Sequence, residues 1–393
     1  MAAVSEAPAP AASHTDPAAA FAPIQTRSER PHSFDPDDFG LPTGGEVNWK
    51  HTPLGRIQPL LQPDASLSDA QVDIQTTDNA VAISRVPIGS APRGEVFQPE
   101  DVVAARAWQH STEAHLVQIA AEAEVADPIQ IQVRGAADAA ATHVIIDAGA
   151  HSRCTVVLDH LGDGLLAENV ELIVRPGAAL SVVSLQQWQD TAVHLASHQA
   201  RVDADAELRH IVVTLGGSVV RVNPSIELHG AGSRGQMYGL SFADAGQHFE
   251  SQVYLYHRGP HTSGDVLYKS ALQGSGARTV WIGDVLIGPD AVGTDSYEAN
   301  RNLVLSAGAR ADSIPNLEIE TGDIVGAGHA SATGRFDDEQ LFYLLSRGIP
   351  EAQAQRMVVL GFLSDIVQRI GIPDAEKHLL AELEREITEG QQS

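Results

Sequence analysis

Short apolar runs separated by corners of small residues fill the middle of the chain, from about residue 125 to residue 325. Three times in succession a strand-like run is followed by a corner and a second strand-like run, and the corner alanines Ala150, Ala178 and Ala206 stand 28 residues apart. This period is too short for two parallel strands joined by a full helix. A strand, a corner and a return strand at a fixed period are typical of a stacked β architecture, in which each turn buries its inner face against the next.

The periodic segment therefore predicts a mainly β protein with a β-helix, or a closely related solenoid, as its core. Later corners at His229–Ser233, Asp244–Gly246 and Gln273–Gly276 continue the pattern, although the period drifts. A β-sandwich also alternates strands with turns, so the pattern leaves that fold open as the alternative.

Composition divides the chain into four segments. Residues 1–45 are rich in Ala, Pro, Ser and Asp and contain few large apolar side chains, so we expect a disordered N-terminal tail. Residues 46–124 combine an aromatic anchor at Trp49 with short segments and a helix-like stretch near Asp101, which indicates a small α/β cap. Residues 125–335 are the expected β-helix core, and residues 336–393 are the expected C-terminal helical module.

Three helices are expected in the C-terminal module. The apolar face Leu341–Leu345 belongs to the first, which Gly348 stops, and Pro350 opens the second. Pro373 begins the third. In the second helix the run Met357–Leu363 is apolar on more than one face, which is compatible either with simple covering of the sheet or with burial against a second protein.

Charge and cysteine content exclude several classes of partner. The chain has 51 Asp and Glu against 25 Lys and Arg, a net charge of −26 that repels nucleic acid and anionic membranes. No run approaches the roughly 20 apolar residues of a spanning helix, and the N-terminus lacks the pattern of a signal peptide, so we expect a soluble, cytoplasmic protein. Cys154 is the single cysteine, which excludes an internal disulfide and a thiolate metal site within one chain; we expect it in the core.

Two signs of site chemistry are weak. His194 and His198 have the four-residue spacing of a metal pair on a helix, but four residues of extended chain span roughly 13 Å, so we interpret both as ordinary surface or packing histidines. Paired carboxylates in a β-helix groove would serve carbohydrate cleavage, although aromatic residues, on which sugars stack, are only 5% of the chain. A stand-alone β-helix enzyme acting on a carbohydrate is therefore the alternative function.

Six blocks of sequence, in order, resemble the SufB/SufD family of iron–sulfur cluster assembly proteins. These blocks are Trp49–Leu54, Tyr268–Ser270, Ala277–Trp281, Thr294–Ser306, Ala309–Ile319 and Leu341–Ile349. The resemblance extends from Trp49 to the last helices. The length of the chain and its near-absence of cysteine make it most similar to the SufD subunit rather than to the longer SufB scaffold.

The resemblance implies a right-handed parallel β-helix core with helical N- and C-terminal segments. It also implies a non-catalytic scaffold subunit of a SufBCD-type complex, paired with a SufB-like subunit through the β-helix and with a SufC-like ATPase through the C-terminal helices. The ATP site would belong to SufC. A homodimer of the chain alone stays open, as does a flavin in the assembled complex.

The resemblance also assigns a role to His329. In the family this region often reads Lys-Cys-Ser-His-Gly, and its histidine is implicated where a transient iron–sulfur cluster forms at the SufB interface. Counting back from Gly334 aligns that histidine with His329. A neutral imidazole is a competent iron ligand; the alternative is a histidine that only packs the interface. Ala327 replaces the family's cysteine, and Glu298 stands where glutamine is usual, with a purpose that the sequence leaves open.

The same family architecture implies partner-binding residues near the end of the core. We expect them to form a junction between core and helical module that also orients the SufC-binding surface: Leu341, Phe342, Tyr343, Arg347 and Gly348. A structural role is expected for Asn302, because side-chain amides and hydroxyls can satisfy backbone groups of a solenoid.

Overall fold

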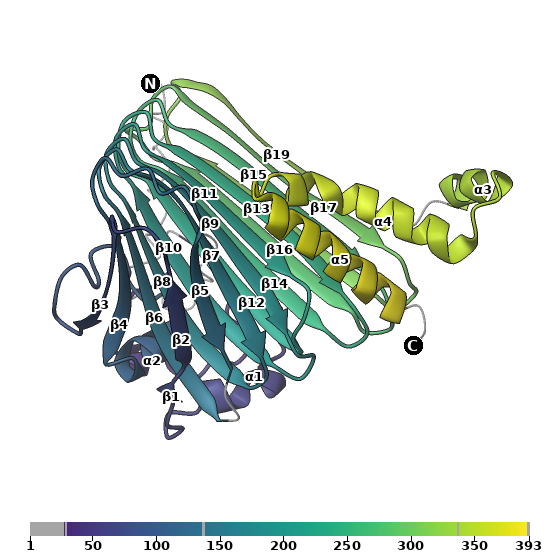
Figure 1. Cartoon of the computed structure of the whole chain (residues 1–393), viewed down its shortest axis with the longest axis horizontal. Helices are drawn as coiled ribbons and strands as arrows, with labels where there is room; N and C mark the ends of the chain where they lie inside the picture. Colours follow the sequence, from purple (N-terminus) through teal and green to yellow (C-terminus); the bar gives the residue numbers. More distant parts are fainter. Residues whose placement is uncertain (1–26, 28–29, 136–137, 336–337, 391–393) are drawn as a thin grey trace, which may run out of the picture.

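The computed structural model describes residues 27, 30–135, 138–335 and 338–390 and shows a solenoid of two facing β-sheets (Figure 1). Successive strands alternate between the sheets. In the described residues sheet A has ten strands: β1 (Ser68–Asp69), β3 (Val81–Pro87), β4 (Glu113–Ile119), β6 (Ala139–Ala148), β8 (Leu165–Val174), β10 (Val193–Val202), β12 (Val219–Leu228), β14 (His248–His257), β16 (Arg278–Ile287) and β18 (Arg310–Ile319).

Sheet B faces sheet A across the core. Within the described parts of the chain it has nine strands: β2 (Gln71–Gln75), β5 (Ile129–Arg134), β7 (Arg153–Gly162), β9 (Ala179–Trp188), β11 (Glu207–Thr214), β13 (Arg234–Ala243), β15 (Ser263–Leu272), β17 (Thr294–Val304) and β19 (Ile324–Arg335).

Parallel pairing holds the turns together. From β4 to β17, each strand pairs in parallel with the strand two places further along the chain, for example β8 with β10 and β17 with β19. Antiparallel pairs, β2 with β5 and β3 with β4, lie at the N-terminal end. A β-sandwich is built from antiparallel sheets. The parallel ladders therefore confirm the predicted mainly β solenoid and exclude the sandwich.

The predicted corners at Ala150, Ala178, Ala206 and His229–Ser233 lie where the chain passes from sheet A to sheet B, and those at Asp244–Gly246 and Gln273–Gly276 lie where it returns to sheet A. The passages from sheet A to sheet B share one geometry. One residue at each corner has a left-handed backbone, namely His151, Gly177, Asp205, Gly232, His261 and Gly293. Its N–H donates to a carbonyl of the next turn, as from His151 to Pro176. At Gly177 a Cβ would lie 2.2 Å from Nδ1 of His151, so only glycine fits. The alanines Ala178 and Ala206, on which the repeat prediction depends, are buried immediately after such corner residues.

Inward-facing side chains fill the space between the sheets and alternate with outward-facing ones along each strand. Most are aliphatic and form one continuous core that passes through successive turns. Buried polar groups interrupt this core around Glu168 and, close to the last turn, around Glu298. The side chains of β18 and β19 are only half-buried or exposed.

Helices cover the outer face of each sheet (Figure 1). On sheet A lie α1 (Leu54–Leu61) and α2 (Val102–His110), and on sheet B lie α4 (Glu351–Gln368) and α5 (Pro373–Gly390). The helix predicted near Asp101 is α2, which Asp101 caps by accepting a hydrogen bond from a backbone N–H of its first turn.

The N-terminal segment is anchored on sheet A. Trp49 is buried, as predicted, and the guanidinium of Arg221 lies 4.0 Å from the centre of its ring. Arg221 also pairs with Asp101 at 3.1 Å and with Glu250 at 3.3 Å. This buried charge network joins the segment before α1, the cap of α2 and two strands of sheet A.

Part of the expected tail also packs on the core. Residues 1–26, 28 and 29 lie outside the described residues. Of the remainder, Arg27 is buried and pairs with Glu100 at 2.7 Å, and Arg30 is buried and donates to Gln252. A short 3-10 helix, η3 (Pro36–Asp38), follows. These residues are therefore ordered, because buried ion pairs and hydrogen bonds compensate for their few apolar side chains.

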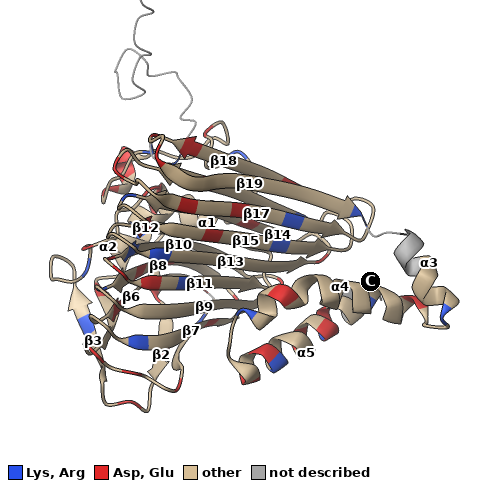
Figure 2. Ribbon diagram, turned by 90° about the horizontal axis from the view of Figure 1, so that it is seen from above, with Lys and Arg blue, Asp and Glu red and all other residues tan. Residues whose placement is uncertain are grey.

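The second and third C-terminal helices begin where the sequence predicts. Pro350 precedes α4, and Pro373 is the first residue of α5. Both helices bury aliphatic side chains, among them Leu363, against sheet B. The first helix of the module, α3 (Asp338–Ser346), extends beyond the sheet (Figures 1 and 2) and is followed by Gly348 with φ +82°.

Candidate functional site

The solenoid ends in two strand edges, one in each sheet. β18 is the last strand of sheet A and β19 the last of sheet B; we call their outer edges the open end. Figure 2 shows both strands at one end of the stack, opposite β2 and β3. In the described part of the chain no strand pairs with the open end. Such an edge offers a row of N–H and C=O groups that a second protein can bind.

His329 lies on β19 at this open end. In the strand register it is directly beside Glu298 of β17. The His329 side chain is 45% exposed, whereas Glu298 is 1% exposed, and 3.7 Å separates His329 Nδ1 from Glu298 Oε1. This separation exceeds a hydrogen bond. A partner on the open end would therefore meet an accessible imidazole with a buried carboxyl group behind it.

Glu298 is buried with no hydrogen-bond partner on either carboxyl oxygen among the described residues. Burial, and after it the charge of Asp284, raise the pKa of Glu298 to about 8, so this carboxyl group is mainly protonated at neutral pH. Gly283 makes room for it, because a Cβ there would lie 2.4 Å from Glu298 Oε2. The group can therefore become an oxygen ligand or a proton donor when a cation or partner arrives.

Polar side chains beside this pair bond to one another. Asn302 Nδ2 donates to Ser313 Oγ at 2.9 Å and to Thr333 Oγ1 at 3.1 Å, which connects β17 with both edge strands. Ser313 in turn donates to Asn300. Asn302 therefore joins strands through side chains, whereas the role predicted for it was to satisfy backbone groups.

Comparisons with known proteins identify the family to which this solenoid belongs. The core domain described as "SUF system FeS cluster assembly, SufBD core domain" matches residues 131–362. An iron–sulfur cluster assembly SufBD family protein of Mycobacterium tuberculosis is 46% identical over 363 residues, covering 90% of this chain and 91% of the relative. The chain belongs to the SufBD family. A Mycobacterium leprae member is also 46% identical, over 365 residues that cover 91% and 93% of the two chains.

A second SufBD family protein of Mycobacterium leprae is similar to only part of this chain. It is 30% identical over 250 residues, which are 62% of this chain but 28% of that longer protein. The SufBD core match contains both Glu298 and His329. In the described residues, no helix of this SufBD protein has the length and hydropathy to cross a membrane.

The expected partner-binding residues of this SufBD protein lie on and after α3. Phe342 is 72% exposed and Tyr343 is also exposed. The Arg347 guanidinium lies 5.1 Å from the centre of the Tyr343 ring. Leu341 belongs to α3, but its side chain is outside what the structure describes. This exposed apolar surface of α3 is thus available to a partner.

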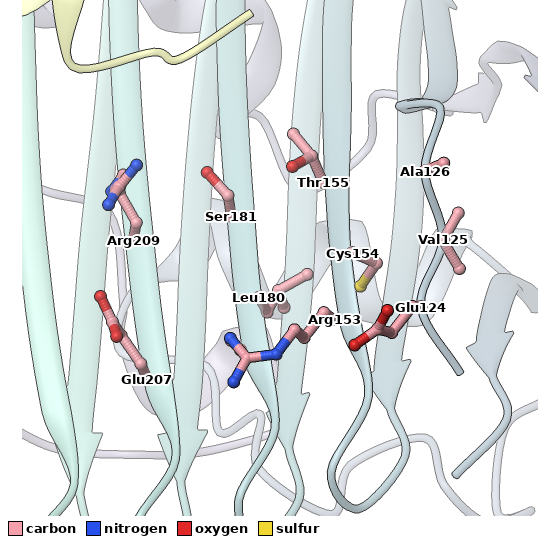
Figure 3. A pocket seen from close by; sticks show the side chains of 11 residues that line it. Glu124, Val125, Ala126, Arg153, Cys154, Thr155, Leu180, Ser181, Glu207 and Arg209 are labelled. Carbon is pink, nitrogen blue, oxygen red and sulfur yellow. The ribbon is translucent and has the colours of Figure 1, made fainter. Parts of the chain in front are cut away.

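A pocket on sheet B is relevant to the alternative function, that of a stand-alone enzyme acting on a carbohydrate. It has a volume of about 510 Å³ and is lined by residues of β7, β9 and β11 and the segment before β5 (Figure 3). Figure 3 shows Arg153 between Glu124 and Glu207, so the two carboxylates of the pocket lie on either side of a guanidinium cation. None of the described residues that line it is aromatic. The pocket gives no support to sugar binding by stacking.

Cys154 is one of the residues that line this pocket, and it is buried in the core between the sheets, as predicted. Burial raises the pKa of its thiol to about 12, so it is unsuited to act as a nucleophile or to bind metal.

His194 and His198 occupy a site that sequence reasoning missed. Both are buried and both approach the same carboxylate, that of Glu168 on the neighbouring strand, together with His160 from sheet B. We call His160, Glu168, His194 and His198 the lumen cluster. Both are packed in the interior, which is one of the two roles expected of them. Side chains four apart on a strand point to the same side, so both rings lean toward one carboxylate between them although the strand spans roughly 13 Å over that distance. The meeting of these side chains at Glu168 depends on the register between neighbouring strands, which the spacing of residues along one strand does not reveal.

Proposed function

We propose that this SufBD protein is a cytoplasmic, non-catalytic scaffold subunit of a SufBCD-type complex. Its open end pairs with a longer, SufB-like member of the family, and its C-terminal helices bind a SufC-like ATPase. The observation that carries the proposal is the open end itself, where a half-exposed imidazole lies on a strand edge available for pairing. Family membership gives the process, iron–sulfur cluster assembly.

Similarity to two proteins of one organism supports pairing between unlike members. In Mycobacterium leprae one SufBD protein matches this chain along nearly its full length, and the other matches it across a limited part. Two solenoids with related cores can join edge to edge, because each offers strand edges with the same spacing.

His329 is the proposed contribution of this chain to a transient cluster shared with SufB. Its neighbours Gly326, Ala327, Gly328 and Ala330 are small and let a partner backbone approach closely. Because Ala327 provides no thiolate, the partner has to supply the sulfur ligands. Imidazole coordination of iron is established chemistry, and Glu298 lies near enough to support a cation at the same place.

The proposed ATPase surface is the exposed side of the C-terminal module. α4 and α5 are fixed on sheet B, whereas Phe342 and Tyr343 of α3 and Met357 of α4 expose apolar surface. Exposed apolar side chains that gather on one surface commonly mark a protein interface. Phe342→Ala should weaken ATPase binding severalfold in a pull-down from purified components while leaving the melting temperature unchanged.

Co-expression with a SufB-like protein and a SufC-like ATPase tests the scaffold role. We expect a stable complex containing all three proteins, measured by light scattering after size exclusion, and no hydrolase activity of this chain alone. A chain that stays alone under these conditions, or that cleaves a carbohydrate, contradicts the proposal.

Reconstitution of the cluster tests His329 itself. His329→Ala should lower iron and acid-labile sulfide in the complex several-fold without loss of subunits. The matched control is His229→Ala, because His229 is similarly exposed, at 48%, and also lies beside a glutamate, with 2.9 Å between its Nδ1 and Glu227 Oε1. Equal cluster content in both variants would leave His329 with a packing role only.

A further inference from the structure

The lumen cluster lies between the sheets, several turns away from the open end. Glu168 of β8 is opposite Ala196 in the strand register, and His194 and His198 of β10 flank that position. His160 reaches the same carboxylate from β7 of sheet B. The cluster therefore links both sheets and is independent of any partner on the open end.

One oxygen of Glu168, Oε2, is the common point of the cluster. It is 2.8 Å from His160 Nε2, 3.4 Å from His194 Nε2 and 3.8 Å from His198 Nε2. The ligand atoms of His160, Glu168 and His194 all lie within 4.8 Å of one another. Around a tetrahedral ion with bonds of about 2.0–2.1 Å, neighbouring ligand atoms are roughly 3.3 Å apart. The observed separations bracket that value, so small side-chain movements would admit one ion.

The orientation of His194 is fixed by its second nitrogen. Its Nδ1 lies 2.7 Å from Gln186 Oε1, and the same oxygen accepts a hydrogen bond from Trp188 Nε1 at 2.8 Å. Because that oxygen can only accept, Nδ1 of His194 carries the proton and Nε2 presents its lone pair to the centre of the cluster. Metal-bound histidines commonly have such a partner on the outer nitrogen.

The other two imidazoles have outer partners as well. His160 Nδ1 lies 3.0 Å from the carbonyl oxygen of Leu185, and His198 Nδ1 lies 3.0 Å from His210 Nε2. Gln186 Nε2 lies 3.1 Å from Nδ1 of His160 and donates to it when Nδ1 carries no proton. With a proton on Nδ1 instead, His160 donates to Leu185 and its Nε2 is free to coordinate. All three rings can thus direct Nε2 toward Glu168.

Several atoms at the centre have no hydrogen-bond partner within the described part of the chain. They are His194 Nε2, His198 Nε2 and Glu168 Oε1. Unsatisfied polar atoms in a buried site are unfavourable and uncommon. A proton on His160 Nε2 satisfies Glu168 Oε2 but leaves the lone pair of His194 Nε2 directed at a carboxylate, whereas a cation would bond to both groups.

We propose that the lumen cluster binds one divalent first-row transition-metal ion, zinc or iron(II), through His160, Glu168 and His194, with His198 as the fourth ligand. Imidazole and carboxylate ligands without thiolate suit these ions. Because all four residues are buried, the ion is structural and enters as the chain folds. On binding, the single proton of neutral His160 moves by way of solvent from Nε2, which then coordinates the ion, to Nδ1, which then donates to Leu185.

Metal analysis of the purified chain tests the site. The protein is produced in separate cultures supplied with zinc or, anaerobically, with iron(II), and is dialysed against EDTA before mass spectrometry of its metals. About one ion per chain is expected in the culture that provides the preferred metal. His194→Gln should reduce this to below a tenth. His143→Gln should retain it, because His143 forms a comparable buried pair with Glu171 at 3.4 Å outside the cluster.

Two further measurements keep the test decisive if His194→Gln fails to fold. X-ray absorption of the wild-type chain should show only nitrogen and oxygen neighbours at about 2.0–2.2 Å. His329→Ala should retain the metal, which separates this site from the open end. Less than about a tenth of an ion per chain in both cultures, sulfur neighbours, or metal lost with His329→Ala would each overturn the proposal.

Discussion

Glu298 makes the stability of the isolated chain depend on pH. The folded protein keeps its proton up to about pH 8, whereas the unfolded chain releases it near 4.5. Between these values the unfolded state binds fewer protons, so this contribution to the free energy of unfolding is complete below about pH 4.5 and is lost as pH rises to about 8. The loss amounts to a few kcal/mol at most.

Glu298→Gln should remove that dependence. The variant should gain melting temperature relative to the wild type as pH is raised from 5 to 8, with a constant difference above 8, measured by scanning calorimetry on the chain alone. A difference that stays the same across the whole range would mean that Glu298 is ionised in the folded protein.

The thiol of Cys154 should be unreactive in the folded protein. Its thiol pKa of about 12, against an ordinary value of 9, leaves about a thousandfold less thiolate. A disulfide exchange reagent at pH 8 should therefore find almost no reactive thiol in the native chain and about one per chain in guanidinium chloride. Rapid labelling of the native chain would contradict its place in the core.

At the scale of single residues, sequence reasoning placed Cys154 in the core but missed the lumen cluster. A lone cysteine in an apolar run needs no information beyond its neighbours. The lumen cluster depends on the register between β8 and β10 and on the facing strand β7, which brings His160 and His194 to Glu168. The number of residues between these side chains along the sequence does not predict that they contact one another.

At the scale of elements, α4 should contribute strongly to stability through its contact with sheet B. Leu363 is fully buried in that contact. Leu363→Ala should lower the free energy of unfolding by about 2–5 kcal/mol, seen as a reduced urea midpoint. Met357→Ala, on an exposed position of the same helix, should cost less than about 0.5 kcal/mol. Equal effects of the two changes would mean that α4 is not held by this contact.

Elements with strong local signals could be predicted from the sequence. The corners around Ala178 and Ala206 and the helix starts at Pro350 and Pro373 follow from local geometry. The helix α1 gave no such signal, because it starts without a side-chain cap and contains Pro59; packing against sheet A stabilises it. Long-range burial also orders the segment at Arg27 and Arg30, whose composition resembles that of a disordered chain.

At the scale of the whole molecule, the solenoid has two unlike ends. The N-terminal end finishes with the antiparallel strands β2 and β3, whereas the open end continues the parallel ladders to their last strands. A partner solenoid with parallel strands matches the second end better than the first. We therefore expect association through β18 and β19.

A charge on the open end should prevent that association. Val325 of β19 is 75% exposed, so Val325→Asp should leave the folded chain intact and weaken binding to the SufB-like partner at least tenfold by calorimetric titration. The matched control is Ile83→Asp, on an exposed position of β3 at the other end. If only Ile83→Asp weakens binding, the interface lies at the N-terminal end of the solenoid, which would contradict the proposal.

Hydrogen exchange of the chain, with and without the SufB-like partner, tests the central claim most directly. Unpaired N–H groups at a strand edge exchange fast and become protected when another strand bonds to them. The account predicts new protection concentrated in β18 and β19, including the peptide that contains His329, and unchanged exchange in β2 and β3. Protection confined to β2 and β3, or none in either edge strand despite a stable complex, would contradict it.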